Sequence, residues 1–151
     1  MKDLPDQENP RQAWMSLMAK AGAGRVATLL DAEMARPAFT WLRAPEIGGM
    51  MVRGRAGGTG APFNLGEMTV TRCALTLDGG QVGHAYIQGR RKADAEACAL
   101  VDALMQTDVA ERLRAAVLEP LAAEQAEAKA ARAAKAAATK VDFFTMARGE
   151  D

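Results

Sequence analysis

Hydrophobic side chains recur at helical spacing near the N-terminus of the chain. Asn9-Pro10 has the form of a helix cap followed by a proline in the first turn. The apolar face of residues 11–21 predicts a helix that ends at Gly22 and Gly24. A second short helix follows over 26–34, because its apolar residues also recur every three or four positions.

The middle third alternates instead, which indicates strands. Four strand-like runs are separated by glycine and proline, and they cover residues 38–43, 49–55, 67–77 and 81–90. The segment 45–49 is expected to join the first two runs, and Asp78-Gly79-Gly80 predicts a hairpin turn between the last two. A four-stranded antiparallel meander is the simplest arrangement.

The apolar pattern of the third run changes parity near Arg72. Met68 and Val70 are apolar at even positions, whereas Cys73 and Leu75 are apolar at odd positions. Two explanations are open. A β-bulge would shift the core face, and a strand covered on both faces would need no shift.

Helical spacing returns from Lys92, with one apolar segment ending near Gln106 and another beginning after Thr107-Asp108. Pro120 marks a break or a new first turn. Residues 122–138 are mostly alanine, the residue with the best helix propensity, so they predict a long helix. Alanine buries little area, which suggests a projecting arm.

The helix leads to a hydrophobic tail whose apolar members are Val141, Phe143, Phe144 and Met146. Such side chains are costly to leave in water, at about 1.5–3 kcal/mol each. The tail either folds back on its own core or anchors the chain in another subunit, and we favour the anchor.

Together these elements predict the α+β class. We expect a small antiparallel sheet of about four strands in the middle, flanked by N-terminal and C-terminal helices. The chain of 151 residues suits one domain, 1–151. Within it, 1–8 is expected to be flexible and 122–151 to form the helical arm and tail.

Composition excludes several classes of function. The 19 basic and 19 acidic side chains cancel, which argues against nucleic-acid binding. No apolar run approaches the ~20 residues that span a bilayer, and the polar N-terminus does not resemble a secretory signal. Two distant cysteines and one histidine make a metal site in this chain improbable, and they suit a reducing cytosol.

A glycine-rich stretch, RAGGTG at 55–60, is the clearest candidate for chemistry. Glycines expose backbone N–H groups, and arginines lie beside them, so a phosphorylated ligand is one interpretation. A glycine-rich turn is the other. The segment lacks the Gly-Lys-Ser/Thr of a Walker A loop and the spacing of a dinucleotide fingerprint. Its candidate phosphate contacts are Arg53, Arg55, Gly57, Gly58, Thr59 and Gly60.

His84 is the one histidine, and it lies in a segment expected to be a strand. It could serve as a general base near neutral pH, or it could be structural. The sequence shows no partner that would complete a catalytic arrangement, so the structural interpretation is favoured. Catalytic residues are unknown at this level.

Several segments, in order, resemble the PhnG family of the bacterial carbon–phosphorus lyase system. They are RQAWMS at 11–16, RAGGTG at 55–60, GEMTVTR at 66–72, GRRK at 89–92, AEACALVDALMQ at 95–106 and VDFFTM at 141–146, followed by Arg148-Gly149. The closing segment is the most specific. The resemblance is weakest in 1–8, in the second helix and in the alanine-rich helix.

The resemblance implies a cytoplasmic, multiprotein complex with PhnH, PhnI and PhnJ that serves phosphonate breakdown. With PhnH, PhnI and PhnL, a PhnG subunit is associated with transfer of the ribose triphosphate moiety of MgATP to an alkylphosphonate, which displaces adenine. PhnG would then be a subunit of a transferase with no cofactor of its own, and MgATP would be a substrate of the complex. The family offers no established catalytic residue to carry over.

Three hypotheses follow. In the first, an accessory subunit clamps a catalytic partner and lines an anionic substrate path with Arg53, Arg55, Arg72 and Arg90, since arginine forks match phosphate oxygens. In the second, the chain is a scaffold without substrate contact, and these arginines pair with partner carboxylates. In the third, it is an independent small enzyme or phosphate-binding protein.

Overall fold

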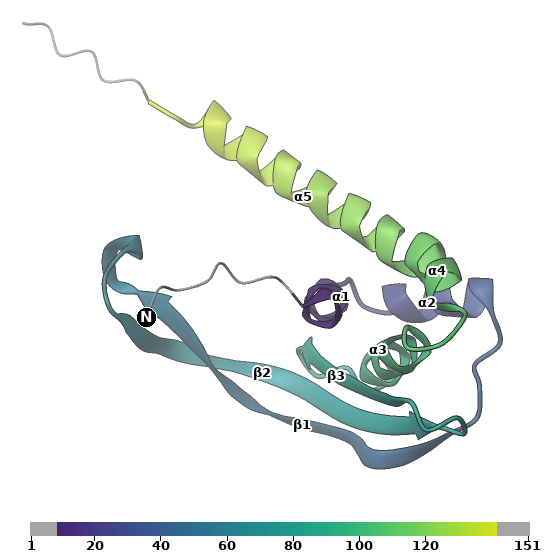
Figure 1. Ribbon diagram of the computed structural model, residues 1–151. Helices are drawn as coiled ribbons and strands as arrows, with labels where there is room; N and C mark the ends of the chain where they lie inside the picture. Colours follow the sequence, from purple (N-terminus) through teal and green to yellow (C-terminus); the bar gives the residue numbers. More distant parts are fainter. Residues whose placement is uncertain (1–8, 142–151) are drawn as a thin grey trace, which may run out of the picture.

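A computed structural model of the chain describes residues 9–141. A three-stranded antiparallel sheet is packed against helices, and a long helix projects from them (Figure 1). The class is α+β, as predicted. In chain order the elements are α1 (Pro10–Ala19), α2 (Arg25–Glu33), β1 (Phe39–Arg55), the short helix η1 (Ala56–Gly58), β2 (Pro62–Leu77), β3 (Val82–Gln88), α3 (Lys92–Leu104), α4 (Ala110–Leu113), the π-helical turn η2 (Arg114–Leu118) and α5 (Glu119–Ala138).

The N-terminal caps follow from the sequence. The side chain of Asn9 accepts a hydrogen bond from the backbone N–H of Arg11 at 3.1 Å, and Pro10 occupies the first turn of α1. Gly24 begins α2 with φ = 71°, a left-handed conformation that favours glycine. Both predicted N-terminal helices are therefore confirmed.

The sheet has three strands, in the order β1-β2-β3, so the prediction of four was wrong. The runs 38–43 and 49–55 belong to one strand, and the predicted connection at 45–49 lies inside it. Two residues, Ala44 and Pro45, face one residue of β2 where the register shifts between Arg43 and Glu46. A bulge on an edge strand tolerates proline, because its missing N–H breaks no ladder.

The change of parity in β2 reflects burial on both faces. Between Val70 and Thr76 the strand keeps an unbroken register with β3. Cys73 and Leu75 are buried on the face toward α3, and Val70 and Ala74 are buried on the opposite face. The bulges opposite this segment lie in β1. The predicted turn at 78–80 is present, with Gly80 at φ = 88°.

Helix α3 is the centre of the core, because nearly all its side chains from Ala95 to Leu104 are buried. One face lies on β2 and β3, and α1 and α2 pack against it from the other side. The contact with β3 is close at Gly83, where an added Cβ would lie 1.9 Å from the carbonyl oxygen of Ala99. A side chain at position 83 would therefore push the sheet away from the helix.

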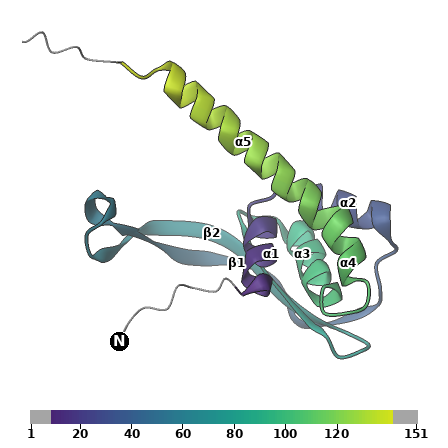
Figure 2. The ribbon, with the colours of Figure 1, turned by 45° about the horizontal axis from the view of Figure 1, so that its top comes forward.

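The C-terminal helix leaves the body, as the sequence predicted. Its last buried side chain is Leu121, and it continues to Ala138. Pro120 lies in the first turn of α5, directly after the π-helical turn η2. The hairpin of β1 and β2 also extends beyond the body, toward the same side as α5 in both ribbon views (Figures 1 and 2).

Candidate functional site

The hairpin of β1 and β2 carries most of the predicted site residues. Strand β3 pairs with β2 only over residues 70–76, whereas β1 pairs with β2 from Phe39–Leu77 to Arg55–Pro62. Beyond the end of β3, residues 49–69 therefore form a two-stranded ribbon, which we call the hairpin arm. The glycine-rich segment is the loop at its tip.

The tip loop is closed by its own hydrogen bonds. Gly57 and Gly58 have φ angles of 61° and 83°, which explains the need for glycine there. The N–H of Gly60 donates to the carbonyl of Ala56 at 2.9 Å, and the guanidinium of Arg55 donates to the carbonyl of Gly60 at 3.1 Å. These contacts match the turn interpretation. Thr59 and its glycine neighbours lie in a mostly exposed loop, and Arg53, Arg55 and Gly58 line an open surface hollow beside it.

Arg72 stands apart from the other candidate arginines. Its Nε donates to Glu46 Oε1 at 2.5 Å, and Arg43 donates to the same oxygen at 2.5 Å. Hydrogen bonds hold the pKa of Glu46 below its ordinary value, and the one from Arg43 has a larger effect than the one from Arg72. The pKa of Arg72 is raised, most by a hydrogen bond with Tyr86 and next by the hydrogen bond with Glu46. Arg72 thus forms an ion pair within its own chain, on the sheet face turned away from α3.

Arg90 occupies a different position, beside the base of the hairpin arm. It lines a surface hollow with Gly48, Gly49, Glu67 and Thr69. The glycine at 49 makes room for the Glu67 side chain, because an added Cβ there would lie 1.9 Å from Glu67 Oε1. The hollow therefore offers one cation, one hydroxyl and one carboxylate around exposed backbone.

The arginines divide into two groups. Eight of the twelve in residues 9–141 form ion pairs with carboxylates of the described chain. The four that form none with another described residue are Arg53, Arg55, Arg90 and Arg132. Three of these are predicted site residues, at the tip or base of the hairpin arm. The structure therefore leaves Arg53, Arg55 and Arg90 without a carboxylate partner among the described residues, whereas Arg72 pairs with Glu46.

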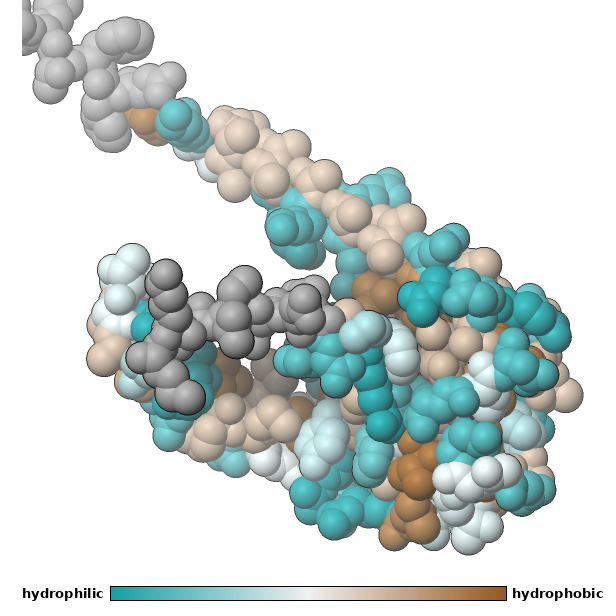
Figure 3. Space-filling model, in the orientation of Figure 1, coloured by the Kyte–Doolittle hydropathy of each residue, from teal (hydrophilic) through white to brown (hydrophobic). Residues whose placement is uncertain are grey.

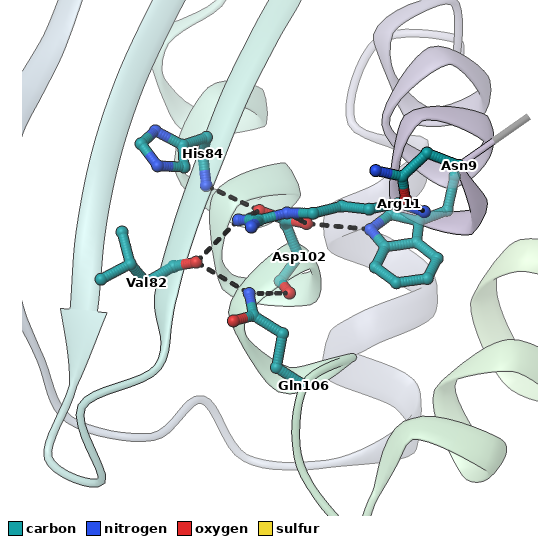
Figure 4. A network of polar contacts seen from close by, with 7 residues as sticks. Asn9, Arg11, Val82, His84, Asp102 and Gln106 are labelled. Carbon is teal, nitrogen blue, oxygen red and sulfur yellow. Dashed lines mark hydrogen bonds and ion pairs between the residues drawn. The ribbon is translucent and has the colours of Figure 1, made fainter.

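A buried network that the sequence analysis missed joins α1, α3 and β3 (Figure 4). The side chain of Asp102 is fully buried. Its carboxylate accepts hydrogen bonds from Arg11 Nε and Nη2, at 3.1 and 2.7 Å, and from Trp14 Nε1 at 2.9 Å. A fourth comes from the backbone N–H of His84 at 2.8 Å. The sequence did contain a signal for this network, because Asp102 is a charged residue within the apolar segment 95–105.

This network is structural rather than catalytic. The hydrogen bond to Asp102 raises the pKa of Arg11, which keeps the guanidinium charged. Its Nη2 also donates to the carbonyl of Val82 at 2.9 Å, so both carboxylate oxygens of Asp102 and the Nε and Nη2 groups of Arg11 have partners within the protein. The His84 side chain is exposed and points away from the carboxylate (Figure 4).

The described residues contain no assembled catalytic centre. Cys73 and Cys98 are buried free thiols, and burial raises the pKa of each to about 12, so they are protonated at neutral pH. Residues 9–141 hold no group of three or more side chains that could bind a metal ion. None of their helices is long and apolar enough to cross a bilayer. What these residues could do chemically is bind an acidic group, through arginine side chains and exposed backbone N–H groups.

Comparison with known proteins supplies the family. The model of a family described as phosphonate metabolism protein PhnG matches residues 9–149, nearly the whole chain. The chain belongs to the PhnG family. A PhnG relative from Rhizobium meliloti (strain 1021), named alpha-D-ribose 1-methylphosphonate 5-triphosphate synthase subunit PhnG, is 43% identical over 141 residues. The alignment covers 93% of this chain and 90% of that relative.

The family match spans both features that carried the resemblance in the sequence. It includes the tip loop at 55–60 and the closing VDFFTM segment. Of that segment, Val141 is described and is 66% exposed, whereas Phe143, Phe144 and Met146 lie outside the described residues. The PhnG assignment places the chain in phosphonate metabolism.

Proposed function

We propose that this chain is the PhnG subunit of an α-D-ribose 1-methylphosphonate 5-triphosphate synthase. The complex would transfer the ribose triphosphate moiety of MgATP to an alkylphosphonate and displace adenine. The observation that carries the proposal is the near end-to-end match to a relative that bears this name. From the same resemblance, the partners would be PhnH, PhnI and PhnL, with PhnJ in the core complex, and the compartment would be the cytoplasm.

The geometry favours an accessory role over independent catalysis. Within residues 9–141, the most buried charged pair, Arg11–Asp102, is internally satisfied, and both thiols are protonated. Arg53 and Arg55 lie on a projecting ribbon, and Arg90 lines an open surface hollow rather than an enclosed cavity. A water-excluding reaction site built from this chain alone is therefore not supported, since catalysis relies on preorganised, enclosed groups.

Arg90 is the arginine we assign to a substrate path. Its hollow combines a cation with Thr69 and with the backbone of Gly48 and Gly49, a set that suits phosphate or phosphonate oxygens. Glu67 in the same hollow would meet the magnesium ion or cationic groups from the partner. The alternative is a scaffold without substrate contact, in which Arg90 pairs with a partner carboxylate.

Reconstitution tests the proposal. The purified subunits are mixed with MgATP and methylphosphonate, and adenine release is measured with and without this chain. We expect release to depend on the chain, and the chain alone to release none. Turnover of MgATP by the isolated chain would instead support an independent enzyme.

A second comparison separates substrate contact from scaffolding. Arg90→Ala should lower adenine release about 10- to 100-fold in a complex that still assembles, because one phosphate contact is lost. Lys92→Ala, two residues away and exposed, is the matched control and should leave release unchanged. Full activity of the Arg90→Ala complex would favour the scaffold.

A further inference from the structure

Exposed apolar side chains are concentrated on one hairpin. Eight large hydrophobic residues in the described chain are exposed, and six of them lie on β1 and β2. These six are Leu42, Ile47, Met50, Met51, Phe63 and Leu65. Leu65, at 65% exposure, and Met51, at 54%, are as open as residues of a surface loop. Scattered exposed residues are ordinary, but a concentration on one element marks an interaction surface.

Four of the six, Met50, Met51, Phe63 and Leu65, lie on the hairpin arm, and they occupy both of its faces. Met50 pairs across the strands with Met68, and Phe63 and Leu65 both approach Gly54, so these side chains share the face turned away from α3. Met51 alternates with Met50 and points to the other face of the arm. A two-stranded hairpin is marginally stable in water without a covering layer. The arm lacks such a layer among the described residues, so both of its faces are open to a partner.

The backbone edges of the arm are also open. Residues 62–68 of β2 have β1 on one side and no described strand on the other, because β3 ends at Gln88 opposite Val70 and the N–H of Gly89 donates to the carbonyl of Thr69. By contrast, the outer edge of β3 is closed at His84 by Asp102 and at Val82 by Arg11 and Gln106. Unpaired N–H and C=O groups therefore accompany the apolar side chains along β2 in the arm, and the outer edge of β1 also has no partner strand among the described residues.

The charges of the arm specify the chemistry of its partner. Between residues 47 and 69 the basic residues are Arg53 and Arg55 near the tip, and Glu67 near the base is the one acidic residue. Neither arginine forms an ion pair with another described residue, although eight other arginines do. Arginine is enriched at protein interfaces and pairs there with carboxylates.

We propose that the hairpin arm inserts into an apolar cleft of another subunit of the synthase, with carboxylates at the end of the cleft meeting Arg53 and Arg55. The inference rests on the proposed function. The arm would be covered on both faces, and a strand of the partner would continue the sheet along β2 where β3 ends. Helix α5, which projects to the same side, leaves space for a partner between the two arms (Figure 3).

Hydrogen exchange tests the insertion directly. In the isolated full-length chain, amides of residues 50–68 should exchange rapidly, while those of 71–77 should be protected by the core. In the assembled complex, exchange in 50–68 should slow by about 10-fold or more. Unchanged exchange in the complex would overturn the proposal.

A matched pair of variants gives the second test. Phe63→Ser with Leu65→Ser should weaken association with the other subunits about 30-fold or more, since two central apolar contacts are lost. Tyr86→Ser is the control, because Tyr86 is 43% exposed, close to the 44% of Phe63, but lies over the body of the same sheet. Equal effects of the two variants would overturn a specific role for the arm.

The tip arginines need a separate measurement. Arg53→Glu should weaken association without any nucleotide present, and the loss should shrink as salt is raised. An association that changes only when triphosphate is added would show that the tip binds an anion instead.

The remaining outcomes distinguish the occupants. If the wild-type chain does not associate with the synthase subunits, the proposed function fails as well; if it associates and the Phe63/Leu65 variant does so equally, only the hairpin inference fails. A purified chain that is a dimer, and becomes monomeric with the same variant, would assign the arm to a second copy. Faster exchange of 50–68 after deletion of 142–151 from the isolated chain would assign it to the chain's own tail.

Discussion

The carboxylate of Asp102 in α3 accepts a hydrogen bond from the backbone N–H of His84 in β3, at 2.8 Å. Alternate residues of an edge strand point their backbone groups away from the sheet. Asp102 and Arg11 occupy two of these positions in β3, at His84 and Val82. One ion pair therefore fixes α1 against α3 and closes the sheet edge.

Asp102→Ala should strongly destabilise the chain. It leaves Arg11 without its buried partner and the N–H of His84 without an acceptor, which together cost about 3–5 kcal/mol of unfolding free energy. Urea denaturation followed by circular dichroism measures the loss. The control is Asp31→Ala, which breaks an exposed pair with Arg36 and should cost at most about 1 kcal/mol. Similar losses in the two variants would contradict the assigned role.

Gly83→Ala should destabilise the core by about 1–3 kcal/mol. The new Cβ would overlap the carbonyl oxygen of Ala99, and backbone cannot move aside as a flexible side chain can. Gly66→Ala is the control, since nothing lies within 4 Å of an added Cβ there. Thermal unfolding of both variants checks this; a Gly83→Ala variant as stable as Gly66→Ala would show that β3 and α3 are not in close contact.

Alkaline pH should weaken the fold through the two thiols. Burial raises the pKa of Cys73 and Cys98 from 9.0 to about 12. A pKa raised in the folded state means that the unfolded chain ionises first. The stabilisation is therefore complete below pH 9 and is lost as the pH rises from 9 toward about 12.

The measurement is the unfolding free energy between pH 8 and 11, compared with a Cys73→Ala/Cys98→Ala variant. The variant should show a shallower decline, because the two buried thiols no longer contribute to it. A thiol reagent at pH 8 should modify the native chain slowly and the unfolded chain at once. Rapid modification of the native chain would argue against burial.

Deletion of residues 142–151 tests the hypothesis of a C-terminal anchor. This segment lies outside the described residues, so the anchor stays a prediction from Phe143, Phe144 and Met146. We expect the shortened chain to keep its unfolding midpoint and to associate more weakly with the other synthase subunits, because two aromatic anchors are lost. Undiminished co-purification would dismiss the anchor.

Local patterns predicted the helices well, because capping and helical spacing are written in neighbouring residues. Asn9-Pro10 and the alanine-rich run are examples. The division of β1 failed at Pro45, since proline and glycine suggest a loop, whereas a bulge on an edge strand accommodates them. Whether a proline ends a strand depends on whether a neighbouring strand needs a hydrogen-bond donor at its position. The local sequence does not show which strand lies beside it.

The site shows the same limit. Arg53 and Arg72 look alike in the sequence, but Glu46, which pairs with Arg72, is 26 residues away and meets it only through strand register. Asp102 and Arg11 are separated by 91 residues, so their pairing could not be read from spacing. What the sequence did indicate was the tip loop, whose glycines serve a turn.

The closed edge of β3 has a consequence for where another chain can pair with the sheet. Over the body, one edge is occupied by side chains and the other is interrupted by Pro45 and two bulges. Over the body, the sheet edges are therefore poor templates for pairing with the sheet of another copy. Among the described residues, the edge of β2 in the hairpin arm is a stretch where a strand from another chain could pair without meeting a blocking side chain.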